Sequence, residues 1–405
     1  MQSLRSQRKK IGVSTTVAVA AIIVIAIVAG VAGYFSGAGQ VTTTTVTEHR
    51  TTTVTQTLAA QTVTVTQTAT VTQTVAGEGV LGRKLKVAII VPGRANDYGW
   101  NQEGVESLRK VAAKFGAEFS FSEGLGYGEP PLRALEDYIR KGYDLVVGHA
   151  GGYREFCLEL VRTGRIGQSK VLIVSEAQEG MEERDVVPGK LGTYSFVVTA
   201  ASYPAGYLAG LMTKSNIVGI VQSVETDINW IRQSAAFAQG LKAANPKAKL
   251  LFTVVGSYED PAKGKEFTAA QIGLGADVIF GQGDGTSFGI MDACRDAGVW
   301  FIDVIGDKRA IDEKGILLTS VLWDFSVAYE QALIDIYNGE FGKHNYYMSH
   351  ANRAIYLLTL NPKVPADVAT KVSEISQKIQ AGEIKVKVPN NIEDLHAIFR
   401  ELGYE

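Results

Sequence analysis

The stretch KVAIIVPGRANDYGWNQEG, residues 86–104, decides the fold class of this chain. Its apolar run ends at Pro92 and Gly93, which is typical of a buried parallel strand. Apolar residues then recur at helical spacing as far as Phe115, so a short loop connects the strand to a helix. Ligands of open α/β sheets bind at such loops, beyond the carboxyl ends of the strands. The loop offers three side chains that suit a ligand: Asn96, Asp97 and Trp100. From this loop alone, a ligand-binding role for Trp100 and a structural role in packing the start of the helix are equally compatible with the sequence.

The pattern of alternating strands and helices runs from residue 84 to about residue 304 and is duplicated. GYDLVVG at 142–148 corresponds to GADVIFG at 275–281, and Asp-x-x-Trp occurs both at 97–100 and at 227–230. Alternation at these lengths predicts parallel, helix-covered sheets. The sequence therefore predicts an α/β protein with two similar lobes and a cleft between their strand ends, and the recurrence of Asp-x-x-Trp favours a ligand-binding role for Trp100 and Trp230.

The domain organisation follows from these patterns. We expect lobe 1 at residues 84–197, completed by about 318–345, and lobe 2 at residues 198–317. Residues 346–405 would then supply a C-terminal crossing strand and helices. Two further loops carry candidate ligand contacts. Asp284, in GQGDGTS at 281–287, could accept hydrogen bonds from a ligand, and its alternative role is a helix N-cap. The corresponding loop of lobe 1 holds His149 and Tyr153, whereas we interpret SYEDP at 257–261 as mainly structural.

The N-terminal part differs from the rest of the chain. Residues 1–10 form a basic flank, and an uncharged apolar run from about 11 to 34, within an expected segment 11–35, exceeds the ~20 residues needed to cross a bilayer. The basic flank predicts a cytoplasmic N-terminus and an extracellular ligand-binding domain on a single-pass anchor in the cell membrane. A cleaved signal sequence is the alternative. Residues 36–83, rich in Thr, Val and Gln, are expected to form a low-complexity stalk, either glycosylated or a bare disordered linker.

Charge, cysteines and motifs exclude several classes of function. Forty basic and forty-two acidic residues give a net charge of −2, which provides no electrostatic case for nucleic-acid binding. Two cysteines make no disulfide framework and no metal signature. The sequence has no GxSxG elbow, Walker A loop or HExxH helix. We therefore expect a non-enzymatic binding protein without cofactor or metal.

Several motifs in a fixed order support a more specific interpretation. They are DYGWNQ at 97–102, YPAGYLAG at 203–210, FAQG at 237–240, NP at 245–246, SYEDPAKGKE at 257–266, GADVI at 275–279 and TSV at 319–321. Over about residues 85–388 the chain resembles the basic membrane protein family of ABC-transporter substrate-binding proteins, whose best-known members take purine nucleosides. The resemblance implies a type I periplasmic-binding fold, in which two lobes joined by three crossovers close over one small ligand. It also implies ABC permease and ATPase subunits as partners.

The departures from the family pattern concern the ligand. Nucleoside-binding relatives carry Val-Asp-Ser-Asp-Gln where this chain has VIGDK at 304–308, so the first Asp, which holds ribose hydroxyls, becomes Ile305, and Asp307 remains as a candidate contact. A Lys of those relatives corresponds to Trp323 in this chain. The second-lobe aromatic residue that stacks on the purine in those relatives corresponds to Gln233, so Trp230 would take over that stacking role. A branch thought to bind free bases carries Trp at the place of Trp100. The resemblance therefore implies a purine base as ligand, with a purine nucleoside, or a sensory ectodomain of the same fold, as alternatives.

Overall fold

The computed structural model describes residues 43–58, 61–76, 83–175 and 185–405, and the chain divides into two compact units, Met1–Arg83 and Lys84–Glu405. The described part of the first unit is an antiparallel hairpin of β1 (Thr43–Leu58) and β2 (Gln61–Ala76), with Val54 opposite Val65. A bare linker had been one expectation for this stretch. Its alternating Thr and Val residues are β-branched, which favours a strand over a disordered chain.

The membrane anchor expected at residues 11–34 lies outside the described residues. Within the described part of the chain, no helix is both long and apolar enough to cross a membrane.

The first lobe of the second unit is built on a parallel sheet in the order β13-β7-β6-β5-β3-β4. Its strands are β3 (Lys86–Ile90), β4 (Glu118–Ser122), β5 (Leu145–Gly148), β6 (Lys170–Val174), β7 (Leu191–Phe196) and β13 (Asn345–Met348). The helices of this lobe are α2 (Trp100–Phe115), α3 (Glu129–Arg140), α4 (Arg154–Arg162) and α9 (Ser326–Asn338). The central strands β3 and β5 are almost completely buried, as their continuous apolar runs predict.

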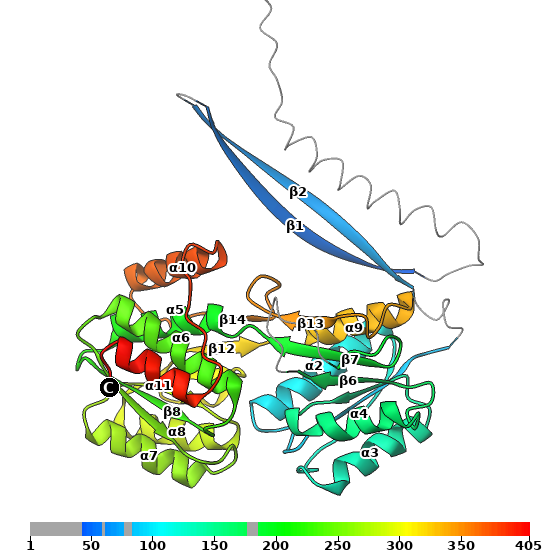
Figure 1. Cartoon of the computed structure of the whole chain (residues 1–405). Coiled ribbons are helices and arrows are strands. Elements are labelled where there is room, and N and C mark those ends of the chain that lie inside the picture. The colour runs from blue at the N-terminus through cyan, green and yellow to red at the C-terminus, as the bar shows by residue number, and fades with distance from the viewer. Residues whose placement is uncertain (1–42, 59–60, 77–82, 176–184) are drawn as a thin grey trace, which may run out of the picture. The chain divides into compact units, whose positions relative to one another are not determined.

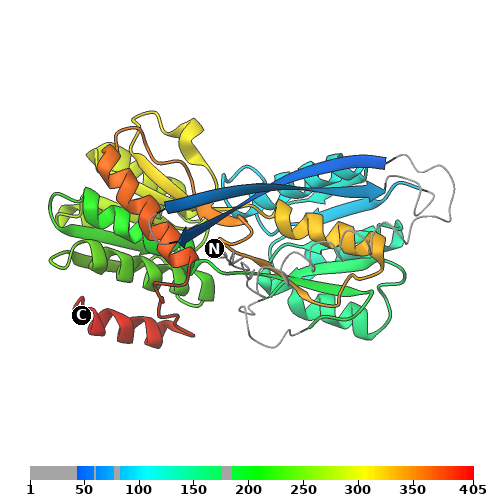
Figure 2. The same ribbon diagram turned by 90° about the horizontal axis from the view of Figure 1, so that it is seen from above.

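The second lobe repeats this plan with a sheet in the order β14-β12-β11-β10-β8-β9 (Figure 1). The strands are β8 (Ile217–Gln222), β9 (Lys249–Val254), β10 (Val278–Gln282), β11 (Trp300–Ile305), β12 (Leu317–Trp323) and β14 (Ile355–Leu357), of which β14 runs antiparallel to β12. The helices are α5 (Thr199–Met212), α6 (Ile228–Ala244), α7 (Pro261–Gly273), α8 (Gly285–Ala297), α10 (Ala366–Gln380) and α11 (Ile392–Glu401). In Figure 2 the orange α10 and the red α11 lie on this lobe, against α5 and α6 respectively.

The described chain crosses between the lobes three times: from β7 to α5, from β12 to α9 and from β13 to β14. The strand β12 corrects one expectation, because residues from about 318 were expected to complete the first sheet. Instead β12 pairs in parallel with β11 in the second sheet, and only α9 and β13 return to the first lobe. Only a short connection, containing the 3-10 turn η2 (Lys308–Ile311), separates β11 from β12. Consecutive elements joined so closely usually become neighbours in one sheet.

Candidate ligand-binding site

A cavity of about 280 Å³ lies where the strand-end loops of the two lobes meet. Both lobes contribute to its wall, which includes three of the four tryptophans of the chain. The lining residues are Trp100, Tyr127, Ala150, Gly151, Gly152, Val174, Thr226, Asp227, Ile228, Asn229, Trp230, Tyr258, Asp284 and Trp323. The volume lies just below the range of ligand pockets, which hold drug-sized ligands at roughly 300–1,000 Å³. The cavity therefore suits a small aromatic molecule.

Trp100, at the first turn of α2, is held in one orientation by the residues behind it. The ring of His149 stacks on the indole with 4.2 Å between ring centroids and 22° between the planes. The indole Nε1 donates a hydrogen bond of 2.8 Å to the backbone carbonyl of His149. Phe196 and Phe325 contact the indole edge to face, at 5.7 and 5.3 Å. The side chain is thus fixed before any ligand arrives.

His149 is the support of this arrangement. The ring is fully buried, and burial lowers the pKa of His149 to about 3, so the imidazole is neutral at physiological pH. Its Nε2 lies 3.0 Å from the carbonyl oxygen of Trp100 and must donate to it, which leaves Nδ1 as an acceptor. The hydroxyls of Tyr194 and Tyr329 lie 2.6 and 2.8 Å from Nδ1. We had considered His149 as a ligand contact; the structure places it behind Trp100, outside the cavity wall, with both ring nitrogens engaged.

Trp230 and Trp323 form the opposite part of the wall. Trp230 lies in the first turn of α6, whose N-cap Asp227 accepts hydrogen bonds from the backbone N–H groups of Asn229 and Trp230 at 2.8 and 3.4 Å. Trp323 stacks on Phe196 with 4.6 Å between centroids, and the two indoles lie 5.9 Å apart. Both indole N–H groups are buried without an acceptor among the described residues. Leaving such donors unpaired costs about 1–3 kcal/mol each.

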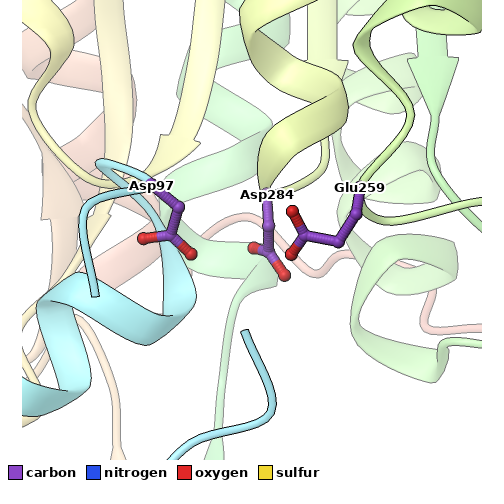
Figure 3. A group of neighbouring side chains, drawn as sticks. All are labelled: Asp97, Glu259 and Asp284. Carbon is purple, nitrogen blue, oxygen red and sulfur yellow. The ribbon is translucent and has the colours of Figure 1, made fainter. Parts of the chain in front are cut away.

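Asp284 lies at the N-terminus of α8 and contributes a carboxylate to the cavity. The side chain makes no capping hydrogen bond to its own helix, so the alternative role that the sequence left open is not the one it adopts. Its Oδ1 instead faces the backbone N–H of Trp100 across the cleft, at 3.4 Å. Carboxylate oxygens of Asp97, Glu259 and Asp284 lie within 4.8 Å of one another (Figure 3). Burial, with the neighbouring carboxylates of Asp97 and Glu259, raises the pKa of Asp284 well above its usual range.

Asp97 belongs to this carboxylate group but has a clear structural task. Its Oδ1 accepts hydrogen bonds from the backbone N–H groups of Gly99 and Gln102, both at 3.0 Å. Its Oδ2 accepts from the backbone N–H and the side-chain amide of Asn101, at 3.1 and 2.7 Å. The three backbone bonds satisfy N–H groups at the start of α2 that the helix itself leaves unpaired. Asp97 therefore anchors the helix that carries Trp100, and its side chain is not part of the cavity wall.

The other residues named from the sequence do not line the cavity. Asn96 is exposed on the loop before α2. Tyr153 is fully buried in lobe 1, and its hydroxyl donates to the carbonyl of Gly126 at 2.9 Å. Asp307 caps η2 and pairs with Arg309. The structure thus brings together four of the predicted contacts: Trp100, Trp230, Asp284 and Trp323.

Sequence reasoning missed several wall residues. The segment at 257–261, interpreted as mainly structural, does cap α7 through Asp260, but it also supplies Tyr258 to the wall and Glu259 to the carboxylate group. The Tyr258 hydroxyl donates to Asp227 at 3.0 Å. Asp227 could have been found, because it opens the second Asp-x-x-Trp. Tyr127, 59 % exposed in a glycine-rich loop, gave no signal in the sequence.

Two α/β lobes, joined by three crossings in the described chain and enclosing one aromatic cavity, define a solute-binding protein of the periplasmic-binding type. Residues 84–390 match the family described as ABC transporter substrate-binding protein PnrA-like, or Bmp, and the chain belongs to this family. The family consists of substrate-binding proteins, not enzymes, which confirms that expectation.

Similar proteins extend over most of the chain. The transcriptional activator protein med of Bacillus subtilis (strain 168) is 23 % identical over 294 residues, which cover 73 % of this chain and 88 % of that protein. A purine-binding protein of Brucella abortus (strain 2308) is 23 % identical over 305 residues, or 74 % of this chain and 82 % of that protein. Among solved structures, an ABC-transporter solute-binding protein from Conexibacter woesei DSM 14684 has a TM-score of 0.64 at 24 % identity, covering 75 % of this chain and 99 % of its own. This last likeness concerns the fold alone.

Proposed function

We propose that this chain captures a purine base between its lobes outside the cytoplasm and delivers it to the permease and ATPase subunits of an ABC importer, with residues 11–34 as a single membrane anchor. The observation that carries the proposal is the cavity itself, in which Trp100, Trp230 and Trp323 surround a small space beside Asp284. Family membership supports the transport role, and the name of the Brucella abortus relative supports a purine.

The energetics of such a site are sufficient. A micromolar dissociation constant needs about −8 kcal/mol. A purine base has about ten heavy atoms, so each must contribute roughly −0.8 kcal/mol, below the ceiling of about −1.5 kcal/mol for the best small ligands. Stacking on an aromatic side chain contributes ~1–3 kcal/mol per base. Because His149 already fixes the Trp100 ring, little ordering of that side chain opposes binding.

A free base should bind more tightly than its nucleoside. Where nucleoside-binding relatives keep an acidic and a basic ribose contact, this chain has Ile305 and Trp323, which are 1 % and 2 % exposed. Neither side chain carries a charged group that could bind a ribose. Trp323 lies in the cavity wall and Ile305 does not. A sugar hydroxyl left buried and unpaired costs ~1–3 kcal/mol. Two such groups would weaken nucleoside binding roughly thirty-fold or more.

Titration calorimetry with adenine, guanine, adenosine and guanosine tests the proposal. We expect at least one base to bind roughly thirty-fold more tightly than its nucleoside. Trp100→Ala should weaken base binding about ten- to a hundred-fold, because it removes one stacking face. Trp300→Ala is the matched control, since Trp300 is outside the cavity wall. Equal affinities for base and nucleoside would contradict the preference, and binding unaffected by Trp100→Ala would contradict the site.

A further inference from the structure

The cavity wall has a one-sided charge. Asp227 and Asp284 both line it, and none of the lining residues in the described chain is a lysine, arginine or histidine. Glu259 and Asp97 place two more carboxylates beside Asp284 (Figure 3). A wall of this composition favours positive charge and N–H donors and opposes negative charge.

The cation nearest to this group does not balance it. Lys308 is fully buried, and its Nζ lies 2.5 Å from the equally buried carboxylate of Asp303. The same Nζ donates to the backbone carbonyl of Tyr98 at 3.1 Å. The charge of Lys308 is already paired inside lobe 2. Lys308 lowers the pKa of Asp284, but burial and the carboxylates of Asp97 and Glu259 raise that pKa by more. Of the described cations, only Lys308 lowers the pKa of Asp284, so the negative potential at this carboxylate is only partly balanced by the described residues.

The aromatic side chains act in the same direction. Trp100, Trp230 and Trp323 surround the space, and the hydroxyphenyl groups of Tyr127 and Tyr258 complete it. The face of an aromatic ring carries negative electrostatic potential, so rings grouped around a cavity attract a cation. Aromatic walls and carboxylates together are the arrangement that recognises organic cations.

We propose that this cavity selects its ligand by charge: it takes a flat heteroaromatic molecule that is cationic or presents N–H donors, prefers the cation, and rejects anions. The inference rests on the proposed function only for the ring class, a purine. Among purines it favours amino-substituted and N-alkylated cationic bases, and it excludes oxidised purines that are anionic at neutral pH. A bound cation also offsets the repulsion among Asp97, Glu259 and Asp284 that the closed lobes create.

The test compares ligands that share a ring and differ in charge, on the purified full-length protein. The matched pairs are 9-methyladenine with 3,9-dimethyladeninium and 9-methylguanine with 7,9-dimethylguaninium, and urate serves as the anion. Titration calorimetry should show at least one cation binding about tenfold more tightly than its neutral partner, and urate at least about a hundredfold more weakly than either. Two pairs are used because the added methyl group changes shape differently in each.

Two variants locate the effect. Asp284→Asn keeps the shape and removes a carboxyl group that a bound cation would hold in its ionised form, so the ratio of cation to urate affinity should fall about tenfold. Asp292→Asn is the control, because Asp292 lies on the same helix, is 47 % exposed, pairs with Arg295 and does not line the cavity. If Asp284→Asn does not fold, the ratio of cation to urate affinity measured for the unmodified protein alone decides whether the cavity selects by charge.

The outcomes separate the two proposals. Binding of the cationic purines without any neutral purine would support charge selection and overturn the assignment of a neutral purine base as the ligand. Urate binding within about threefold of the neutral bases would overturn charge selection and leave the purine assignment standing. Absence of binding by every compound would overturn both.

Discussion

Trp100 and His149 show how one buried residue prepares another for a ligand. The imidazole supports the indole by stacking and by a bond from Nε2 to the Trp100 backbone, and only the neutral tautomer with a proton on Nε2 can do so while Nδ1 accepts from tyrosine. A charged imidazolium in this place would be shielded from solvent, and its polar neighbours among the described residues are two tyrosine hydroxyls and a backbone carbonyl, not a carboxylate. The site therefore depends on His149 remaining uncharged.

This dependence predicts a loss of stability in acid. The pKa of His149 is about 3 in the folded chain against 6.5 ordinarily, so below pH 6.5 the unfolded chain binds a proton that the folded chain refuses. Stability is complete above pH 6.5 and falls as the pH drops towards 3, by about 1.4 kcal/mol per pH unit from this residue. Between pH 6.5 and 4.5 the loss is thus about 2 kcal/mol.

Urea unfolding at the two pH values measures this loss. His149→Gln should show a smaller difference than the unmodified chain, whatever its absolute stability, because it removes the titrating group. His396→Gln, on the C-terminal helix α11 and only partly buried, serves as the control. If His149→Gln loses as much stability between the two pH values as the unmodified chain, the argument is wrong.

Single residues also mark the limit of prediction from the sequence. The repeated Asp-x-x-Trp correctly indicated that Trp100 and Trp230 would share a cavity. It could not indicate that Asp97 and Asp227 cap their own helices, nor that Asp284 leaves its helix uncapped and faces the other lobe. Whether an aspartate caps a helix or meets a ligand is decided by its rotamer and by the position of the opposite lobe. Neither is encoded in a local motif.

At the scale of elements, two of the motifs that carry the family resemblance are packing motifs. Gly206 of α5 and Gly240 of α6 lie where these helices touch: a Cβ added to Gly206 would come within 1.9 Å of the Phe237 carbonyl oxygen, and one added to Gly240 within 2.0 Å of the Tyr203 carbonyl oxygen. Glycine is required at both positions because backbone meets backbone. The motifs at 203–210 and 237–240 thus fix the packing of α5 on α6, the helix that presents Trp230.

Gly240→Ala should therefore destabilise the fold. The added methyl group has only backbone atoms to displace, and overpacking of this kind costs about 1–3 kcal/mol or more. Gly273→Ala, at the end of α7 where nothing lies within 4 Å of the new Cβ, is the matched control and should be neutral or slightly stabilising. Chemical unfolding of both variants measures the change in stability. Similar unfolding midpoints would show that α5 and α6 can move apart without loss of stability.

The elements themselves were largely predictable, and the sheet assignment was not. The apolar run before Pro92 and the apolar pattern within 275–281 correspond to β3 and β10, because strands buried on both faces need apolar side chains throughout. Residues from about 318 were expected to complete the first sheet, whereas β12 belongs to the second. Its side chains are equally apolar in either lobe, and the assignment depends on the length of the connection from β11.

At the scale of the whole ligand-binding unit, the structure is closed. Backbone and side chains of the two lobes touch at the cleft: Lys308 donates to the carbonyl of Tyr98, and the N–H of Trp100 faces Asp284. The duplicated sequence pattern predicted two lobes and a cleft, but these contacts join residues some two hundred positions apart. Three crossing segments connect the lobes in the described chain, so hinge motion about them can open the cavity.

Gly306 limits how far the lobes can close. A Cβ at this position would lie 2.0 Å from the carbonyl oxygen of Tyr98 in the opposite lobe, so the closed structure requires glycine here. The preceding Ile305 has a φ of +66°, a conformation that is rare for a β-branched residue and that brings Gly306 to the contact. Alanine at position 306 should leave the open protein folded but prevent full closure, and should weaken ligand binding by at least about tenfold.

Electron–electron distance measurements on the purified full-length chain test this directly. Spin labels at Arg133→Cys on α3 and Lys265→Cys on α7 report from exposed sites on the two lobes, and the native Cys157 and Cys294 are buried and should not react. Ligand should change the distance between the labels to a single closed value in the unmodified background and in the Gly273→Ala control. In Gly306→Ala the distance should remain distributed even at saturating ligand, because the added methyl group keeps the Tyr98 carbonyl away. A variant that closes and binds as the unmodified chain does would show that the lobes can shift past this contact, and that Gly306 does not set the closed state.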